Sequence, residues 1–335
     1  MDNCQIQPDW EWCNKRPTRL GMAAICATSR VAAGLQSLCG NRYSDGFGIL
    51  MYHRVTGRVP GVQAPTSNVT PERLRRQLAG LLARGFVAWP LSELVQAADE
   101  SRSIPANVFA VTFDDGYENN YLHAWPILRE LKVSATIFLA TKYLDTDRPF
   151  PFDDWSATGT SRVPASSWRP LSTTQCAEML ADGLIELGAH THSHDRFLGR
   201  CDEFRRDMRV CLNVFRDRFG IDRPTFAFPF GDRSQELIDA ARQLDLACCL
   251  TTRHQRVRPG DDVYQWGRFY AGATDTPVVL AAKLSGWYTA VATAGKTLTR
   301  PLARIAPGAG RSTMIPLPTN VCREVRGASR TMSQS

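Results

Sequence analysis

The sequence predicts an α/β fold in which a mostly parallel sheet is arranged as an α/β barrel. Short apolar segments without polar alternation, such as NVFAVTF (107–113) and SATIFLA (134–140), are typical of strands buried on both faces. Helical patterns separate these segments, and strands that alternate with helices indicate a parallel sheet covered by helices. The chain has 335 residues, a length at which an α/β barrel is the natural architecture.

The expected elements follow one another from about residue 46. FGILMYH (47–53) is the first expected strand. Residues 70–86 predict a helix, because Thr70 can cap it, Pro71 suits its first turn and Gly85 can end it. The remaining expected segments are a strand at 107–113, a helix around 125–131, strands at 134–140, 184–190 and 225–231, a helix at 235–246 and a strand at 247–252.

Composition divides the chain into three zones. We expect a weakly helical leader at 1–45, the main domain at 46–290 and a basic tail rich in Gly, Pro and Ser at 291–335. The tail has seven Lys and Arg residues against Glu324 alone, so it carries most of the net charge of +7. The main domain is therefore close to neutral, which argues against a nucleic-acid groove. The tail itself could contact anionic lipid or phosphate at a membrane surface.

The N-terminal residues lack the pattern of a signal peptide, because the segment that follows the first basic residues has no clean apolar stretch. No run of about 18 apolar residues occurs that would predict a transmembrane helix. The ten cysteines form no CxxC pair, so neither a zinc ribbon nor a redox motif is indicated. These features predict a cytoplasmic protein, with peripheral membrane contact through the tail as an alternative.

Two short polar motifs each follow an apolar strand. The first is TFDDGY (112–117), which places the carboxylates Asp114 and Asp115 where a buried strand ends, the end at which parallel α/β folds assemble their sites. Two buried carboxylates are costly unless a cation or protons compensate their charge, and a metal would let both stay ionised. The second is HTHSH (190–194), where His190 and His194 are spaced to share one face of a helical turn and to bind one metal. Two histidines and one carboxylate leave open positions for hydrolytic chemistry.

These motifs, about 70 residues apart, resemble the first two motifs of the polysaccharide deacetylases, the NodB-homology proteins of carbohydrate esterase family 4. ILMYHRV, SATIFLA, FAFPFG and WGRFY have counterparts in that family as well, so the resemblance covers about residues 46–285. It implies a distorted (β/α) barrel that removes N-acetyl groups from N-acetylglucosamine-type sugars. By position, Asp115, His190 and His194 would bind a divalent metal, often zinc, and Asp114 would be the catalytic base.

The third motif of the family departs from its common form. The chain resembles a branch with the sequence FAYPYG, but both tyrosines are replaced by phenylalanine. The resemblance assigns the oxyanion donor to the backbone N–H of Phe230. The arginine that would steady the base is absent from this motif, and Arg268 in WGRFY is the candidate for that role. The usual C-terminal acid histidine is also missing. In a permuted branch of the family this histidine comes from the N-terminal strand, and the resemblance to that branch makes His53 in MYHRV the candidate general acid, with His254 as the alternative.

The sequence thus predicts a metal-dependent hydrolase that removes the N-acyl group, most simply N-acetyl, of an amino sugar in a polysaccharide or its precursor. Substrate contacts are expected in the long segment 145–172, which contains Trp155 and Trp168. Two alternatives stay open. One is the same chemistry on a lipid-linked sugar or another amide, including deformylation. The other is a carbohydrate-binding homologue without turnover. The exact sugar, the metal and the oligomeric state do not follow from the sequence.

Overall fold

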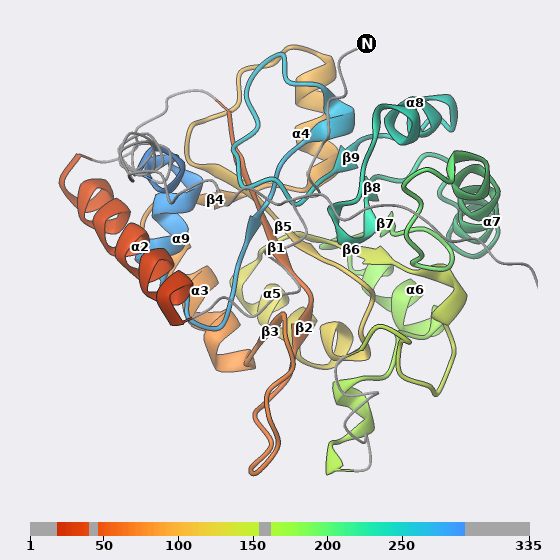
Figure 1. The fold of residues 1–335 in the computed structure, drawn as a ribbon, viewed down its shortest axis with the longest axis horizontal. Coiled ribbons are helices and arrows are strands. Elements are labelled where there is room, and N and C mark those ends of the chain that lie inside the picture. The colour runs from red at the N-terminus through yellow and green to blue at the C-terminus, as the bar shows by residue number, and fades with distance from the viewer. Residues whose placement is uncertain (1–18, 40–45, 154–161, 292–335) are drawn as a thin grey trace, which may run out of the picture. The chain divides into compact units, whose positions relative to one another are not determined.

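The computed structural model describes residues 19–39, 46–153 and 162–291 (Figure 1). All of them belong to one compact unit, Met1–Gly295. The basic tail from residue 292 and Trp155 lie outside the described residues, as does much of the leader. The zone boundaries at 45 and 290 therefore stay predictions.

A curled parallel sheet forms the centre of the described fold, which confirms the predicted fold class. The strands pair in the order β10-β1-β5-β6-β7-β8-β9, with β4 beside β5. A bridge between Leu250 and Trp266 joins β9 to the segment before β10, so the two ends of the sheet approach each other. The strand bounds are β1 (Gly48–Tyr52), β4 (Val87–Ala88), β5 (Val108–Phe113), β6 (Ala135–Leu139), β7 (Ile185–Ala189), β8 (Phe226–Ala227), β9 (Cys249–Leu250) and β10 (Phe269–Tyr270). A separate pair of strands is formed by β2 (Arg54–Val55) and β3 (Asn68–Val69).

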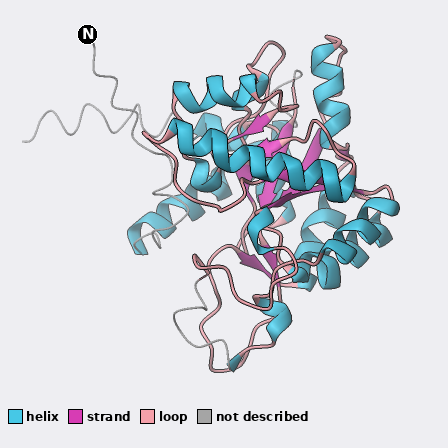
Figure 2. Cartoon of the chain, turned by 90° about the vertical axis from the view of Figure 1, so that its right-hand side faces the viewer, coloured by secondary structure: helices cyan, strands magenta, loops and turns pink. Residues whose placement is uncertain are grey.

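Helices surround the strands (Figure 2). The α-helices are α2 (Arg19–Cys39), α3 (Pro71–Leu82), α4 (Leu91–Asp99), α5 (Trp125–Leu131), α6 (Thr173–Ala181), α7 (Cys201–Phe219), α8 (Gln235–Gln243) and α9 (Pro277–Leu284). Short helical turns are η1 (Asn120–Ala124), η2 (Thr141–Tyr143), η4 (Ala165–Ser167), η5 (Pro229–Gly231) and η6 (Val263–Gln265). In the described part of the chain, no helix is both long and apolar enough to cross a membrane.

The central strands are apolar because both of their faces are covered. Every residue of β1, β5 and β6 is buried. Helix α3 begins as predicted, since the Thr70 side chain accepts a hydrogen bond from the Arg73 N–H and Pro71 takes the first position. The helix ends at Leu82, three residues before Gly85, whose φ of +78° turns the chain towards β4.

The predicted strand at 225–231 is much shorter than expected. Only Phe226 and Ala227 pair with neighbouring strands, and the chain then turns through η5. Pro229 has no N–H to give to a ladder, which explains why pairing stops there. The turn brings Phe230 to the same end of the sheet as Asp114 and His190, where they line one cavity.

Candidate active site

A cavity of about 140 Å³ lies where β1, β5, β7, β8 and β9 end. Each of these strands runs parallel to its neighbour, so the residues that follow them meet at one edge of the sheet. The residues that line the cavity are Met51, His53, Arg54, Thr66, Ser67, Asp114, Asp115, Tyr117, Phe152, Asp153, His190, His194, Phe228, Phe230 and Thr252. The structure therefore gathers both carboxylates and both histidines of the two motifs, together with His53 and Phe230.

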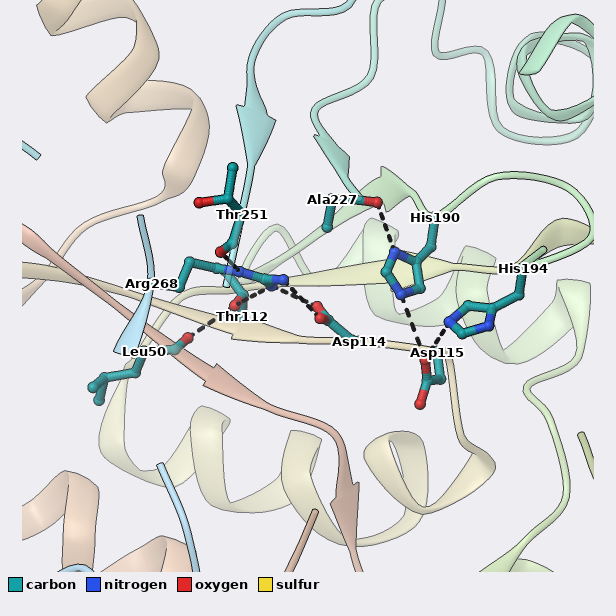
Figure 3. Close-up of polar contacts among 9 residues, drawn as sticks. All are labelled: Leu50, Thr112, Asp114, Asp115, His190, His194, Ala227, Thr251 and Arg268. Atoms are coloured by element: carbon teal, nitrogen blue, oxygen red, sulfur yellow. Dashed lines mark hydrogen bonds and ion pairs between the residues drawn. The ribbon is translucent and has the colours of Figure 1, made fainter. Parts of the chain in front are cut away.

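Arg268 forms a two-pronged ion pair with Asp114 (Figure 3). Nη1 lies 2.6 Å from Oδ1 and Nη2 lies 2.7 Å from Oδ2. Arg268 precedes β10 and is fully buried, and its Nε donates to the Thr251 carbonyl at 3.1 Å. Thr112 stands beside the pair and accepts a hydrogen bond from Nη1 at 3.2 Å. The structure thus places Arg268 against the base that it is expected to steady.

The ion pair fixes the charge of Asp114. Burial by itself raises the pKa of this carboxyl, but the Arg268 guanidinium outweighs burial and holds the pKa below its ordinary value. Asp114 is therefore ionised at neutral pH despite being almost fully enclosed. A carboxylate that is ionised and held in one orientation can accept a proton from a water molecule in the cavity.

Asp115, His190 and His194 form a buried group of three potential metal ligands. Oδ1 of Asp115 lies 3.5 Å from Nε2 of His190 and 3.3 Å from Nε2 of His194. Two ligand atoms on a tetrahedral zinc ion, each about 2.1 Å from it, stand about 3.4 Å apart. Both distances from Asp115 therefore suit one small divalent cation. Burial lowers the pKa of His194, which favours the neutral ring that metal binding needs.

The orientation of His190 suits a metal ligand. Its Nδ1 lies 2.8 Å from the carbonyl oxygen of Ala227, an atom that can only accept, so Nδ1 carries the proton. The neutral ring then turns the lone pair of Nε2 towards the Asp115 carboxylate. Two lone pairs facing each other repel unless a proton or a metal ion lies between them. The donor set thus fits a divalent metal.

The two histidines do not share a helical turn, and that prediction was wrong. Residues 190–194 form a bent loop after β7, in which Thr191 has a φ of +64° and His194 a φ of +58°. The Thr191 hydroxyl accepts a hydrogen bond from the His194 N–H at 2.9 Å and closes the bend. This left-handed backbone, rather than helical periodicity, brings the two rings to one side. His192 points away, with its Nδ1 3.0 Å from the Thr141 hydroxyl.

Helix α7 holds the same loop from outside. Oδ1 of Asp207 accepts the His192 N–H at 2.6 Å, and its Oδ2 accepts the Ser193 N–H at 3.1 Å. On the other flank, the Lys142 N–H donates to the His192 carbonyl at 2.9 Å. The loop is therefore pinned between α7 and η2, which compensates the strain of two left-handed residues.

His53 lies on the cavity wall directly after β1, whereas His254 does not line the cavity. Asn120 donates to the His53 carbonyl at 2.8 Å and fixes the backbone at this point. Within the described residues, Nδ1 of His53 has no hydrogen-bond partner. Phe230 also adopts a left-handed conformation, with φ +58° and ψ 2°, as η5 bends into the cavity.

Several cavity residues were not predicted from the sequence. Phe152 comes from the long segment 145–172, and its ring stacks on His194 with centroids 3.9 Å apart. Asp153 and Arg54 form an ion pair in the wall, beside Tyr117. The segment 145–172 was expected to supply substrate contacts through Trp155 and Trp168, but Trp168 does not line the cavity. The one feature of the sequence that could have indicated the Arg54–Asp153 pair was the position of Arg54 next to the candidate acid His53.

Comparison with known proteins identifies the fold and its relatives. Residues 101–249 match the family model described as polysaccharide deacetylase. A poly-beta-1,6-N-acetyl-D-glucosamine N-deacetylase of Escherichia coli K12 is 26% identical over 153 residues, which is 45% of this chain and 21% of that protein. The enzyme of the same name from Staphylococcus epidermidis is 22% identical over 235 residues, covering 64% of this chain and 75% of that protein.

Solved structures show the same fold. IcaB from Ammonifex degensii is 24% identical, with a TM-score of 0.60 over 71% of this chain and 97% of that chain. The Streptococcus pyogenes deacetylase PplD, solved in complex with acetate, is 19% identical, with a TM-score of 0.59 over 72% of this chain and 99% of that chain. At these identities the likeness concerns the curled sheet and its helices. The match to the E. coli relative spans only about a fifth of that protein's length.

Proposed function

We propose that this chain, which carries a domain of the polysaccharide deacetylase family over residues 101–249, hydrolyses the N-acyl group of an amino sugar. The observation that carries the proposal is one cavity with two buried centres side by side. One is the group of potential metal ligands at Asp115, and the other is the Asp114–Arg268 pair. The substrate class is an N-acetylglucosamine-type sugar in a polymer or its precursor, as the names of the relatives support.

Asp115, His190 and His194 would hold the metal, and zinc is the ion that this donor set suits best. A divalent ion supplies Lewis acidity, which polarises a carbonyl and acidifies water. Asp114 accepts the proton of the attacking water, because it is ionised and its position is locked by Arg268. Positioned proton transfer of this kind contributes about 10²–10⁴-fold to a rate.

The remaining roles belong to His53 and Phe230. Amide cleavage needs a proton on the departing nitrogen, because an amine anion is a very poor leaving group. His53 is the candidate donor, since it is the one non-ligand histidine that lines the cavity in the described part of the chain. The Phe230 N–H is the candidate donor to the oxyanion, on a backbone whose left-handed turn is already formed.

The experiment that tests this function is mass spectrometry of N-acylated glycans after incubation with the protein and a divalent metal. The panel contains N-acetylglucosamine oligomers, their N-formyl counterparts and a lipid-linked N-acylated sugar. Loss of an acetyl mass from the oligomers, absent with Asp114→Asn, supports the proposal. Loss only from the N-formyl or lipid-linked compounds would favour the alternative substrates. No mass change anywhere would favour a binding protein without turnover.

The cellular location also belongs to the proposal. A cytoplasmic protein is expected from the sequence, with peripheral membrane contact through the basic segment 291–335 as an alternative, and residues 292–335 of that segment lie outside the described residues. Sedimentation with vesicles containing anionic lipid, compared for the full chain and a chain ending at residue 291, tests the contact. Equal sedimentation of both would exclude the tail as its source.

A further inference from the structure

A buried ion pair that has no part in the proposed chemistry faces the same cavity. Nη2 of Arg54 donates to Oδ2 of Asp153, and the two residues are 3% and 4% exposed. Both line the cavity with His53 and Asp114. Pairs of this kind add little stability, because replacing a buried ion pair by apolar residues is often neutral or stabilising. A gain in stability therefore does not account for two charges in this cavity wall, where both side chains are placed to meet a ligand.

Arg54 is held in place by neighbours that are themselves buried. The residue before it, His53, gives its carbonyl to Asn120, and the residue after it, Val55, gives its N–H to Oδ1 of Asn119 at 2.7 Å. Asn119 and Asn120 are both fully buried. The guanidinium lies over the ring of Tyr117, 4.3 Å from its centroid. The positive group is thus pre-positioned at the wall.

Asp153 is anchored by a different segment of the chain. Its N–H donates to the Phe150 carbonyl at 3.0 Å, and the preceding Phe152 stacks on His194. The ion pair therefore joins the backbone beside the candidate acid His53 to the segment that covers a metal ligand.

The size and polarity of the cavity indicate which group that is. A volume of about 140 Å³ is close to that of a cavity that encloses one benzene, about 150 Å³. It takes an acylamido group and the adjoining edge of one sugar ring. Arg54 can only donate hydrogen bonds and Asp153 can only accept them, so side by side they match hydroxyls, which do both. Together the two side chains carry no net charge.

We infer that the Arg54–Asp153 pair binds ring hydroxyls of the sugar that carries the acyl group and selects an uncharged glycan. The inference rests on the proposed function, whose substrate class it narrows. The inference predicts how the charge of Asp153 affects the choice between neutral and anionic sugars. Without the Asp153 charge, the wall carries the Arg54 cation alone, which should favour sugars bearing carboxylates.

The test compares two substrates of equal length. One is a neutral N-acetylglucosamine oligomer, and the other alternates N-acetylglucosamine with rings that carry a carboxylate. In Asp153→Asn, KM for the neutral oligomer should rise about tenfold, with kcat within about twofold, as for loss of one hydrogen bond to a charged group. The ratio of kcat/KM values should shift about tenfold towards the anionic substrate.

Two further variants separate recognition from structure. Asp147→Asn makes the same charge change in the same segment, at a side chain that is 89% exposed and pairs with Arg169, and should leave the ratio unchanged. Arg54→Lys keeps both charges but loses the planar guanidinium with its paired N–H donors. KM for the neutral oligomer should therefore rise, while the ratio of the two kcat/KM values should stay unchanged. Arg54→Lys also keeps the test decisive should Asp153→Asn fail to fold.

The outcomes distinguish failure of the inference from failure of the proposed function. Suppose that the wild-type protein releases acetate, and that Asp153→Asn lowers kcat on both substrates while KM and the ratio of the two kcat/KM values stay unchanged. The pair is then only a structural link, and the inference is overturned. Arg54→Lys is judged by the same criterion if Asp153→Asn does not fold. If the wild-type protein releases acetate from neither substrate, the proposed function itself fails, and the inference with it.

Discussion

Both carboxylate oxygens of Asp114 accept hydrogen bonds from the Arg268 guanidinium, and the two side chains are buried. Removing one partner of a buried pair leaves an uncompensated charge, which costs about 3–5 kcal/mol. We therefore predict that Arg268→Met lowers the free energy of unfolding by about that amount, measured by urea denaturation. It should also lower turnover, because Asp114 loses its fixed orientation.

The double variant Arg268→Met with Asp114→Asn controls for packing. Since both charges are then removed, part of the lost stability should return. If Arg268→Met alone is as stable as the wild-type protein, the pair seen here does not stabilise the charge of Asp114.

The alanine variants of His53 and His254 are expected to differ in turnover. His53 lines the cavity and His254 does not, so His53→Ala should keep metal and fold but lose about 10²–10⁴-fold in turnover. His254→Ala should stay near the wild-type rate. Steady-state kinetics with metal analysis of both variants measures this. The reverse pattern would move the general acid to His254.

Individual site residues could be predicted from the sequence where they belong to short motifs. Asp114 with Asp115, and His190 with His194, are close along the chain and follow apolar strands, so their meeting could be predicted. Arg268 was proposed through the family resemblance, and its contact with Asp114 joins residues 154 positions apart. Arg54 and Asp153 are 99 positions apart with no motif around Asp153, so no local pattern could reveal their contact.

At the scale of elements, α7 acts on the site through Asp207, which accepts hydrogen bonds from the loop between the two histidines. Groups that orient metal ligands in this way are typically worth about 10–100-fold in metal affinity. We predict such a loss for Asp207→Ala, measured by zinc titration of the metal-free protein. Asp202→Ala is the matched control, because Asp202 is an exposed residue of the same helix. If Asp207→Ala binds zinc as tightly as Asp202→Ala does, α7 does not position the loop.

Secondary structure could be predicted where periodicity and caps agree, as in α3 and the buried strands β1, β5 and β6. It could not be predicted in the loop 190–194. The spacing of His190 and His194 is compatible with a helical turn, but Thr191 and His194 take left-handed backbone conformations instead. Hydrogen bonds from α7 and η2 stabilise them, and such tertiary support has no signature in the local sequence.

At the scale of the whole described fold, residues 53, 114, 190, 230 and 252 meet because their strands are parallel and end at one edge. Alternating strands and helices predicted this arrangement. The order of the strands and the way residues 266–270 bridge β9 and β1 depend on long-range pairing, so the sequence pattern did not show them. That bridge is what carries Arg268 to Asp114.

The central claim is that adjacent carboxylates divide the work, with Asp115 holding a metal and Asp114 acting as the base. The most direct test measures metal content and acetate release together in Asp114→Asn and Asp115→Asn. We predict that Asp114→Asn keeps its metal and loses about 10²-fold or more in turnover, whereas Asp115→Asn loses the metal and the activity with it. A metal-free Asp114→Asn beside a fully loaded Asp115→Asn would contradict the account.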